Sequence, residues 1–200
     1  RCVISAVGAA SPATTNAVTL TVLRTFSITS QPSNATANEG ATAQFSVTTN
    51  SSSGTVTYQW ERSDDGGANY ASVGGTGQAA TFTTPTLVFA NDNLDRYRVV
   101  ASLVGSAADI TSTHGELTVL RVISISSQPT STAVIEGQTA TFAIGAAITS
   151  GSISYQWQIS TNGGASWSNI NGANSSTYTT PATVYPTTPS EQFRCVLTNS

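Results

Sequence analysis

Few residues of this chain could perform chemistry, and their spacing fits no catalytic site. His114 is the only histidine, and no second histidine or nearby cysteine is available to complete a zinc site or activate a nucleophile. Glu61 and Glu116 fall on predicted strands in different parts of the chain, without the paired acid that glycoside hydrolysis needs. We therefore predict no catalytic residue and no enzymatic activity, and we place His114 on a surface loop.

Two groups of residues carry side-chain oxygens of the kind that binds calcium. One is Asp64 with Asp65, and the other is Asp92 with Asn93 and Asp95. Neither group follows the spacing of an EF-hand or of a repeat-in-toxin loop. We interpret these residues as solvated loop positions, and the sequence predicts no metal site and no cofactor.

Three aromatic residues, Tyr70, Trp167 and Tyr185, are expected to lie nearest the surface. An aromatic platform of this kind could stack on sugar rings. The alternative, which we favour, is that these rings cover the core beneath a second sheet. The sequence names no ligand-binding residue beyond this possibility.

Composition excludes several classes of partner. Hydrophobic residues make up 38% of the chain and charged residues only 8%, and every basic residue is Arg. A net charge of −3 provides no basic surface for nucleic acid or for anionic membranes. No apolar run approaches the length that spans a bilayer. The chain opens in mid-pattern, which suggests a piece of something longer, and its Ser/Thr-rich, weakly charged composition is typical of an extracellular protein.

The most informative stretch is Tyr58-Gln59-Trp60, which returns as Tyr155-Gln156-Trp157. Aromatic and β-branched residues alternate with polar ones around each Trp. A period of two predicts a strand with one buried and one solvated face. We expect each indole at the centre of a β-sandwich core.

Several other segments recur at the same spacing, which indicates tandem domains. Ser30-Gln31-Pro32 returns 97 positions later as Ser127-Gln128-Pro129, and Leu20-Thr21-Val22-Leu23-Arg24 returns 97 positions later as Leu117-Thr118-Val119-Leu120-Arg121. The spacing slips to 96 only after a Gly-rich loop, where a deletion is tolerated.

The repeat divides the chain into three parts. Residues 1–23 are the last two strands of a preceding module, 24–120 form a complete module, and 121–200 form a module without its final strand. No Pro/Gly-rich spacer separates the modules at Arg24 or Arg121. We therefore expect an all-β chain whose modules of about 97 residues are arranged end to end in a restricted orientation.

This pattern resembles the immunoglobulin-like (Ig-like) fold, in the disulfide-free form common in bacterial surface proteins and phage structural proteins. The resemblance rests on the Trp of the third strand and on an aromatic residue two positions before the second cysteine site. It implies that Val47 and Ile144 occupy the first cysteine site, and that Cys195 is a buried free thiol. The predicted core consists of Trp60, Trp157, Tyr58, Tyr155, Phe45, Phe142, Tyr97, Phe193 and Cys195.

We interpret the chain as a structural repeat of a long extracellular assembly, either a bacterial surface filament or adhesin or a phage virion fibre or decoration. Weak multivalent adhesion to surface glycans is an additional role of such repeats. The alternative is a carbohydrate-binding accessory module of a secreted enzyme. The expected partners are further copies of the repeat, either along the chain or in neighbouring subunits. In the second case Ala17 to Val22 of one copy would fill the open edge of another.

Overall fold

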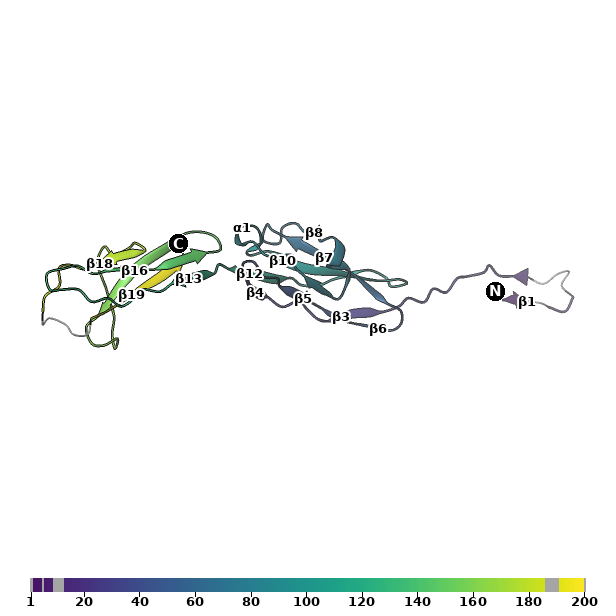
Figure 1. The fold of residues 1–200 in the computed structure, drawn as a ribbon. Coiled ribbons are helices and arrows are strands. Elements are labelled where there is room, and N and C mark those ends of the chain that lie inside the picture. Colours follow the sequence, from purple (N-terminus) through teal and green to yellow (C-terminus); the bar gives the residue numbers. More distant parts are fainter. Residues whose placement is uncertain (1, 5, 9–12, 186–190, 200) are drawn as a thin grey trace.

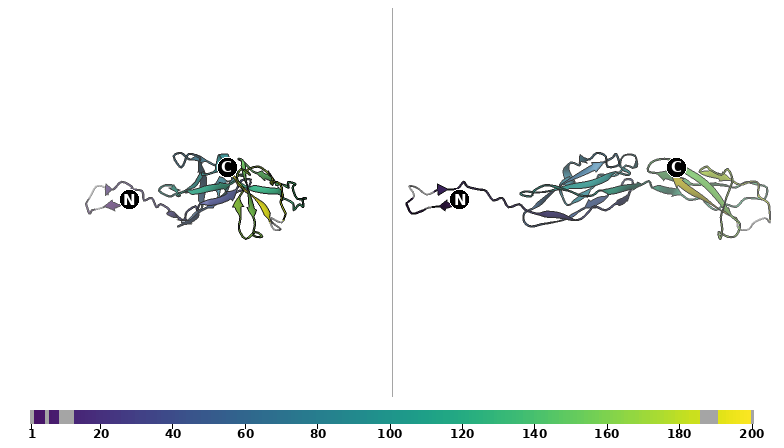
Figure 2. Two further views of the ribbon diagram at one scale, coloured as in Figure 1. Left: turned by 90° about the vertical axis from the view of Figure 1, so that its left-hand side faces the viewer. Right: turned by 180° about the vertical axis from the view of Figure 1, so that it is seen from behind.

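Two β-sandwiches lie end to end, preceded by an extended N-terminal segment (Figures 1 and 2). The computed structural model describes residues 2–4, 6–8, 13–185 and 191–199. We call strands β3 to β12 the first sandwich and strands β13 to β19 the second sandwich. No helix among the described residues is long and apolar enough to cross a membrane.

The first sandwich has the strand order of an Ig-like domain. Its larger sheet runs β4-β12-β10-β7-β8, with β11 beside β10 and a parallel pairing between β4 and β12. The opposing layer pairs β3 with β6 and β5 with β9. The larger sheet consists of β4 (Ala35–Asn38), β12 (Gly115–Leu120), β10 (Arg96–Leu103), β7 (Val56–Ser63), β8 (Ala71–Ser72) and β11 (Ile110–Thr111). The other elements are β3 (Phe26–Ser30), β6 (Thr48–Ser51), β5 (Gln44–Ser46), β9 (Thr81–Thr83), η1 (Gly75–Gln78) and α1 (Phe89–Asp92).

The second sandwich repeats this plan with fewer strands. Its larger sheet runs β17-β16-β19, and the opposing layer pairs β13 with β15 and β14 with β18. The strands are β13 (Ile123–Ser127), β14 (Thr141–Ala143), β15 (Gly145–Ile148), β16 (Ile153–Ser160), β17 (Ser168–Asn169), β18 (Thr177–Thr179) and β19 (Gln192–Asn199). Ahead of both sandwiches, β1 (Val3–Ile4) pairs with β2 (Ala13–Thr14).

Each sandwich is built around its tryptophan. Trp60 and Trp157 are both 0% exposed. The indole N–H of Trp60 donates to the carbonyl of Ala79 at 2.8 Å, and that of Trp157 donates to the carbonyl of Ser175 at 2.9 Å. Because the one polar atom of each ring is hydrogen-bonded, the indole is buried without an unsatisfied donor.

The other predicted core residues differ between the sandwiches. Phe45 and Tyr97 are 1% and 2% exposed. Their counterparts Phe142 and Phe193 are only half-buried, although the rings stack in the same way, with centroids 4.7 Å apart in the first pair and 5.0 Å apart in the second. Three further residues are half-buried and pack against the two cores, namely Tyr58, Tyr155 and Cys195.

The weaker burial in the second sandwich follows from its missing strands. Among the described residues, it has no counterpart of β4 or β12. In the first sandwich, β4 is held by its pairing with β12. The residues of the second sandwich that align with β4 are 132–135, and without such a partner they form no strand. Ile135 is accordingly 81% exposed. The Cys195 thiol, predicted to be buried, is half-buried, on a strand that pairs only with β16 among the described residues.

The predicted closing strand from Ala17 to Val22 does not form. These residues belong to no strand, and Leu20 and Val22 are 87% and 82% exposed. A strand needs a hydrogen-bonded neighbour and an apolar face to cover. Among the described residues β1 pairs only with Ala13 and Thr14 and no strand pairs with residues 17–22, so the predicted strand is absent.

The central role of the indole predicts a specific loss of stability. Trp60→Ala should lower the free energy of unfolding of the first sandwich by about 3–5 kcal/mol, because a large fully buried ring leaves a cavity. NMR resonances of each sandwich, followed through a urea titration, measure the two transitions separately. Val104→Ala, at an 82% exposed position, is the control and should change the free energy of unfolding of the first sandwich by less than about 0.5 kcal/mol. A change below 1 kcal/mol for Trp60→Ala would contradict this account of the core.

Candidate functional site: the joint between the sandwiches

The boundary between the sandwiches is short and held by side chains from both. Strand β12 ends at Leu120 and β13 begins at Ile123, so only Arg121 and Val122 link them. The guanidinium carbon of Arg121 lies 3.9 Å from the centroid of the Phe89 ring on the first sandwich. We call this contact region the joint.

Glu39 is the centre of the joint. Its backbone N–H donates to the carbonyl of Leu120 at 2.7 Å. One carboxylate oxygen accepts the backbone N–H of Phe89 at 3.0 Å, and the other accepts the Ser150 hydroxyl of the second sandwich at 2.6 Å. The backbone of Glu39 thus holds the end of β12, and its side chain holds α1 and the neighbouring sandwich.

Turns deliver these side chains to the joint. Glu39 precedes Gly40, whose φ of +85° favours glycine. Ser150 precedes Gly151, where an added Cβ would lie 2.9 Å from the Asn199 side-chain oxygen and 3.1 Å from the Arg121 guanidinium. Glycine at this position therefore leaves room for Arg121 to lie against its own sandwich and reach the Phe89 ring.

The environment of Glu39 favours its ionised form. Hydrogen bonds from Ser150 first, then from Thr149 and the Phe89 backbone, lower the pKa of the Glu39 carboxyl, and Arg121 adds a smaller effect of the same sign. A group whose pKa is lowered contributes most above its ordinary pKa, and that contribution is lost as the pH falls through the lowered value. The contribution of the Glu39 carboxylate to the joint is therefore fully present above the ordinary pKa of a Glu side chain and is lost in acid.

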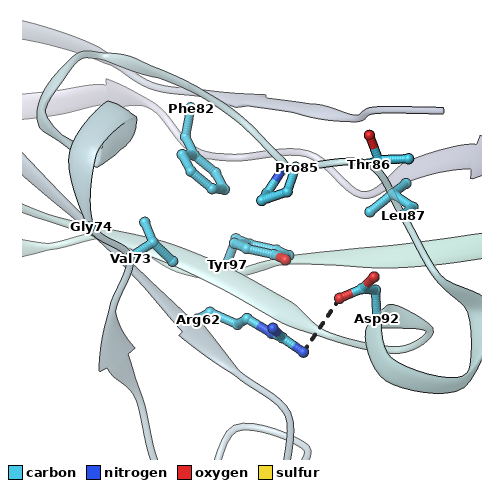
Figure 3. A pocket seen from close by; sticks show the side chains of 9 residues that line it. All are labelled: Arg62, Val73, Gly74, Phe82, Pro85, Thr86, Leu87, Asp92 and Tyr97. Carbon is cyan, nitrogen blue, oxygen red and sulfur yellow. Dashed lines mark ion pairs between the residues drawn. The ribbon is translucent and has the colours of Figure 1, made fainter. Parts of the chain in front are cut away.

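A small cavity of about 180 Å³ lies inside the first sandwich beside Arg62 (Figure 3). The Arg62 guanidinium pairs with Asp95 and, at 3.5 Å, with Asp92. The Tyr97 hydroxyl donates to the Asp95 carboxylate at 3.4 Å. The charges of Arg62 and Asp95 thus face each other beside the cavity, although the buried Nε of Arg62 has no hydrogen-bond partner among the described residues.

The prediction that Asp95 is a solvated loop residue was wrong. Asp95 is 2% exposed rather than a solvated loop residue. Burial raises the pKa of its carboxyl, and the adjacent Arg62 opposes that shift. The carboxylate is buried because it has a cationic partner, which the one-dimensional spacing of Asp92, Asn93 and Asp95 does not indicate.

Three of the remaining acidic candidates, Asp65, Glu61 and Glu116, are also paired with protein groups. Asp65 accepts hydrogen bonds from Ser63 and from the backbone and side chain of Asn69, which lower the pKa of its carboxyl. Glu61 pairs with Arg98 at 2.8 Å, and Glu116 pairs with Arg96 at 3.2 Å. His114 is exposed, as are Asp64 and Asn69. The described residues contain no group of three or more His, Cys, Asp or Glu side chains that could hold a metal ion.

Two of the three surface aromatics are covered by arginines. The Arg98 guanidinium carbon lies 3.8 Å from the centroid of Tyr70, and that of Arg194 lies 4.3 Å from the centroid of Trp167. Arg98 alternates with the core-facing residues of β10, so this stacking is on the outer face of the sheet. Neither ring covers a core or offers that face to a sugar. Tyr185 is 81% exposed.

Sequence reasoning did not single out Glu39, Phe89, Arg121 or Ser150 as interface residues. A signal was available, since Glu-Gly recurs at Glu136 and Ser-Gly at Ser53. That recurrence marks the turns, but only the three-dimensional arrangement brings them to one boundary.

Comparisons with known proteins do not assign a role to this chain. Residues 124–200 match a family model described as a Domain of unknown function (DUF8696). No curated protein matches the chain. Similar solved structures include extracellular domains 3–5 of Drosophila OTK, with 16% identity and a TM-score of 0.48 over 88% of this chain and 57% of that one.

Two further similar structures are also multidomain. The three N-terminal domains of the bacteriophage RB49 Highly Immunogenic Outer Capsid protein share 12% identity, with a TM-score of 0.39 over 88% of this chain and 62% of that one. Immunoglobulin domains 1–5 of Sidekick-1 share 17% identity, with a TM-score of 0.40 over 66% of this chain and 27% of that one. The chain thus spans less than two thirds of these structures, and at such identities the likeness concerns the fold alone.

The joint predicts a measurable titration. Ser150→Ala should raise the pKa of Glu39 toward its ordinary value, because the first of the hydrogen bonds that favour the carboxylate is removed. The pKa is read from the side-chain carboxyl carbon by NMR as a function of pH. Ser53→Ala changes the equivalent serine of the first sandwich, away from Glu39, and should leave that pKa unchanged. Equal titration curves for Ser150→Ala and the unmodified chain would show that the two sandwiches do not meet at Glu39 in solution.

Proposed function

We propose that this chain is a non-enzymatic structural repeat of a long extracellular assembly. The assembly is of the kind formed by bacterial surface filaments and adhesins or by phage virion fibres and decorations. The observation that carries this proposal is the joint, where a two-residue link and contacts at Glu39 and Phe89 hold successive modules end to end. A chain of such modules holds its two ends a set distance apart, a role that needs no catalytic site.

The joint limits bending because its contacts act together. A cation–π pair such as Arg121 on Phe89 contributes about 0.5–1 kcal/mol at an exposed site. Alone, that would leave the modules free to swing. Here the Ser150 hydroxyl also donates to Glu39 across the boundary. Arg121 and Glu39 are in turn positioned by hydrogen bonds to Asn199 in the second sandwich and to Leu120 in the first. Bending about the link therefore breaks the contacts at Phe89 and at Glu39 together.

The extracellular setting is also part of the proposal. Its support is compositional, since charged residues make up only 8% of the chain and the polar surface is mainly Ser, Thr, Asn and Gln. The proposal includes the disulfide-free form of the fold. Both cysteines are free in the structure, and Val47 and Val99, at the two cysteine sites of the first sandwich, are buried there.

A carbohydrate-binding accessory role receives less support. The aromatic faces of Tyr70 and Trp167 are occupied by Arg98 and Arg194. Stacking on a sugar would require the guanidinium groups to leave. Weak adhesion of many copies to a surface remains compatible with a filament, because linked copies raise the effective concentration of one another.

Single-molecule FRET tests the stiffness of the joint. Dyes at Ser72→Cys and Ser168→Cys, both exposed positions on different sandwiches, are used after Cys2 and Cys195 are changed to Ser. We expect one narrow efficiency distribution, and Arg121→Ala should broaden it because the stacking contact is lost. Arg24→Ala removes the equivalent arginine away from the joint and should leave the distribution narrow. A broad distribution in the unmodified chain would contradict the rigid-repeat proposal.

A further inference from the structure

Two Asn-Gly pairs lie in turns of the second sandwich, at Asn162-Gly163 and Asn171-Gly172, and the sequence contains no other. An asparagine that precedes glycine can modify itself, because glycine has no side chain to shield its backbone nitrogen from the amide carbon of the asparagine side chain. The reaction needs only water and a side chain that can turn toward that nitrogen. Both asparagines are exposed, so water reaches each of them. They differ in how firmly their side chains are held.

The side chain of Asn162 is held by hydrogen bonds at both of its polar atoms. Its Oδ1 accepts the Ser160 hydroxyl at 2.9 Å and the Ser166 backbone N–H at 2.9 Å. Its Nδ2 donates to the Ser166 hydroxyl at 2.8 Å. Turning the Asn162 amide toward the nitrogen of Gly163 therefore breaks three hydrogen bonds.

The side chain of Asn171 makes no hydrogen bond to any described residue. Asn171 lies in a turn that is closed by the Ala173 N–H, which donates to the carbonyl of Ile170 at 3.2 Å. Gly172 follows with a φ of +74°, and an added Cβ there would meet no atom within 4 Å. The Asn171 amide can thus approach the nitrogen of Gly172 without breaking a contact.

We propose that Asn171 is a site of spontaneous deamidation, which converts it to aspartate and isoaspartate, and that Asn162 is protected by its hydrogen bonds. The Gly172 nitrogen loses its proton to hydroxide and attacks the side-chain amide carbon of Asn171. A new nitrogen–carbon bond forms, the bond to the side-chain nitrogen breaks, and ammonia leaves, which closes a succinimide ring. Water then opens the ring. Opening at the side-chain carbonyl gives aspartate, and opening at the backbone carbonyl gives isoaspartate, in which the main chain runs through the former side chain.

The turn that carries Asn171 is tied to the buried Trp157. The Ile170 N–H donates to the carbonyl of Trp157 at 2.9 Å, and the Trp157 N–H donates to the carbonyl of Ala173 at 3.0 Å. Gln156 also donates to the Ile170 carbonyl at 2.9 Å. Isoaspartate adds one carbon to the main chain between the two ends of this turn, so it strains the hydrogen bonds to Trp157. Aspartate adds only a charge at an exposed position.

Mass spectrometry of the full chain, aged in mildly alkaline buffer and then digested with chymotrypsin, tests the proposal. Cleavage after Trp167 places Asn162 and Asn171 on different peptides, and the exchange of nitrogen for oxygen changes the mass of each. We expect Asn171 to convert at least about 10-fold faster than Asn162, because only Asn162 must break hydrogen bonds first. The rate should rise with pH, since the attacking nitrogen must lose its proton. Unaged chain, digested in parallel, corrects for conversion during the digest.

Ageing the same chain in urea separates the effect of the fold from that of the local sequence. Both side chains are free in the unfolded chain, so the two rates should agree within about threefold. Ser166→Ala should raise the Asn162 rate about 3- to 10-fold in the folded chain alone, because one of the protecting hydrogen bonds is lost. Two results would overturn the proposal. One is an Asn171 that converts no faster than Asn162 in the folded chain, and the other is an equally large difference in urea.

Urea unfolding of the aged chain, followed by NMR resonances of each sandwich, measures the effect on the core. The isoaspartate form should unfold its second sandwich at a lower urea concentration, while the first sandwich is unchanged. Asn171→Asp carries the charge without the added main-chain carbon and should unfold as the unmodified chain does. Equal unfolding of the isoaspartate form and Asn171→Asp would refute the strain at Trp157. The reaction requires no partner, so these outcomes are independent of the proposed structural function.

Discussion

The pairing of β12 with its neighbours is the constraint on which most of the molecule depends. Leu117 and Val119 close the core of the first sandwich, and the parallel pairing with β4 exists only because β12 is present. The same strand ends at Leu120, whose carbonyl accepts the Glu39 N–H, and passes directly into Arg121. One strand thus completes a core, creates an edge strand and places the side chain that reaches back across the joint.

The second sandwich shows what this strand contributes, because among the described residues the two modules share all their strands except β4, β11 and β12. Without a counterpart of β12, residues 132–135 are not a strand and the space beside Phe142 and Phe193 is open. Trp157 is nonetheless fully buried. The indole is held by β14, β16, β18 and β19, so the centre of the core is independent of the strand that seals its edge.

Several of the few charged side chains are paired with other groups of the protein. Arg62 neutralises Asp95 within the first sandwich, Arg98 pairs with Glu61 beside Tyr70, and Arg121 lies on Phe89. Exposed ion pairs contribute little to stability. Their main effect here is on geometry, since each guanidinium fixes the orientation of an aromatic ring or a carboxylate. The resulting surface offers little electrostatic attraction to other molecules, which suits a spacer built from repeated modules.

Period-two alternation around Trp60 and Trp157 was sufficient to predict the strand that carries each Trp and the burial of both indoles. Local alternation determines which face of a strand is apolar, so these features are readable in one dimension. The partners of Asp95, Glu39 and Tyr70 could not be predicted from the sequence, because each of these residues pairs with one that is distant in the chain or lies in the next sandwich. The strand predicted from Ala17 to Val22 failed for a related reason. Sequence determines that a segment is able to form a strand, but only the tertiary structure decides whether a neighbouring edge is there to receive its hydrogen bonds.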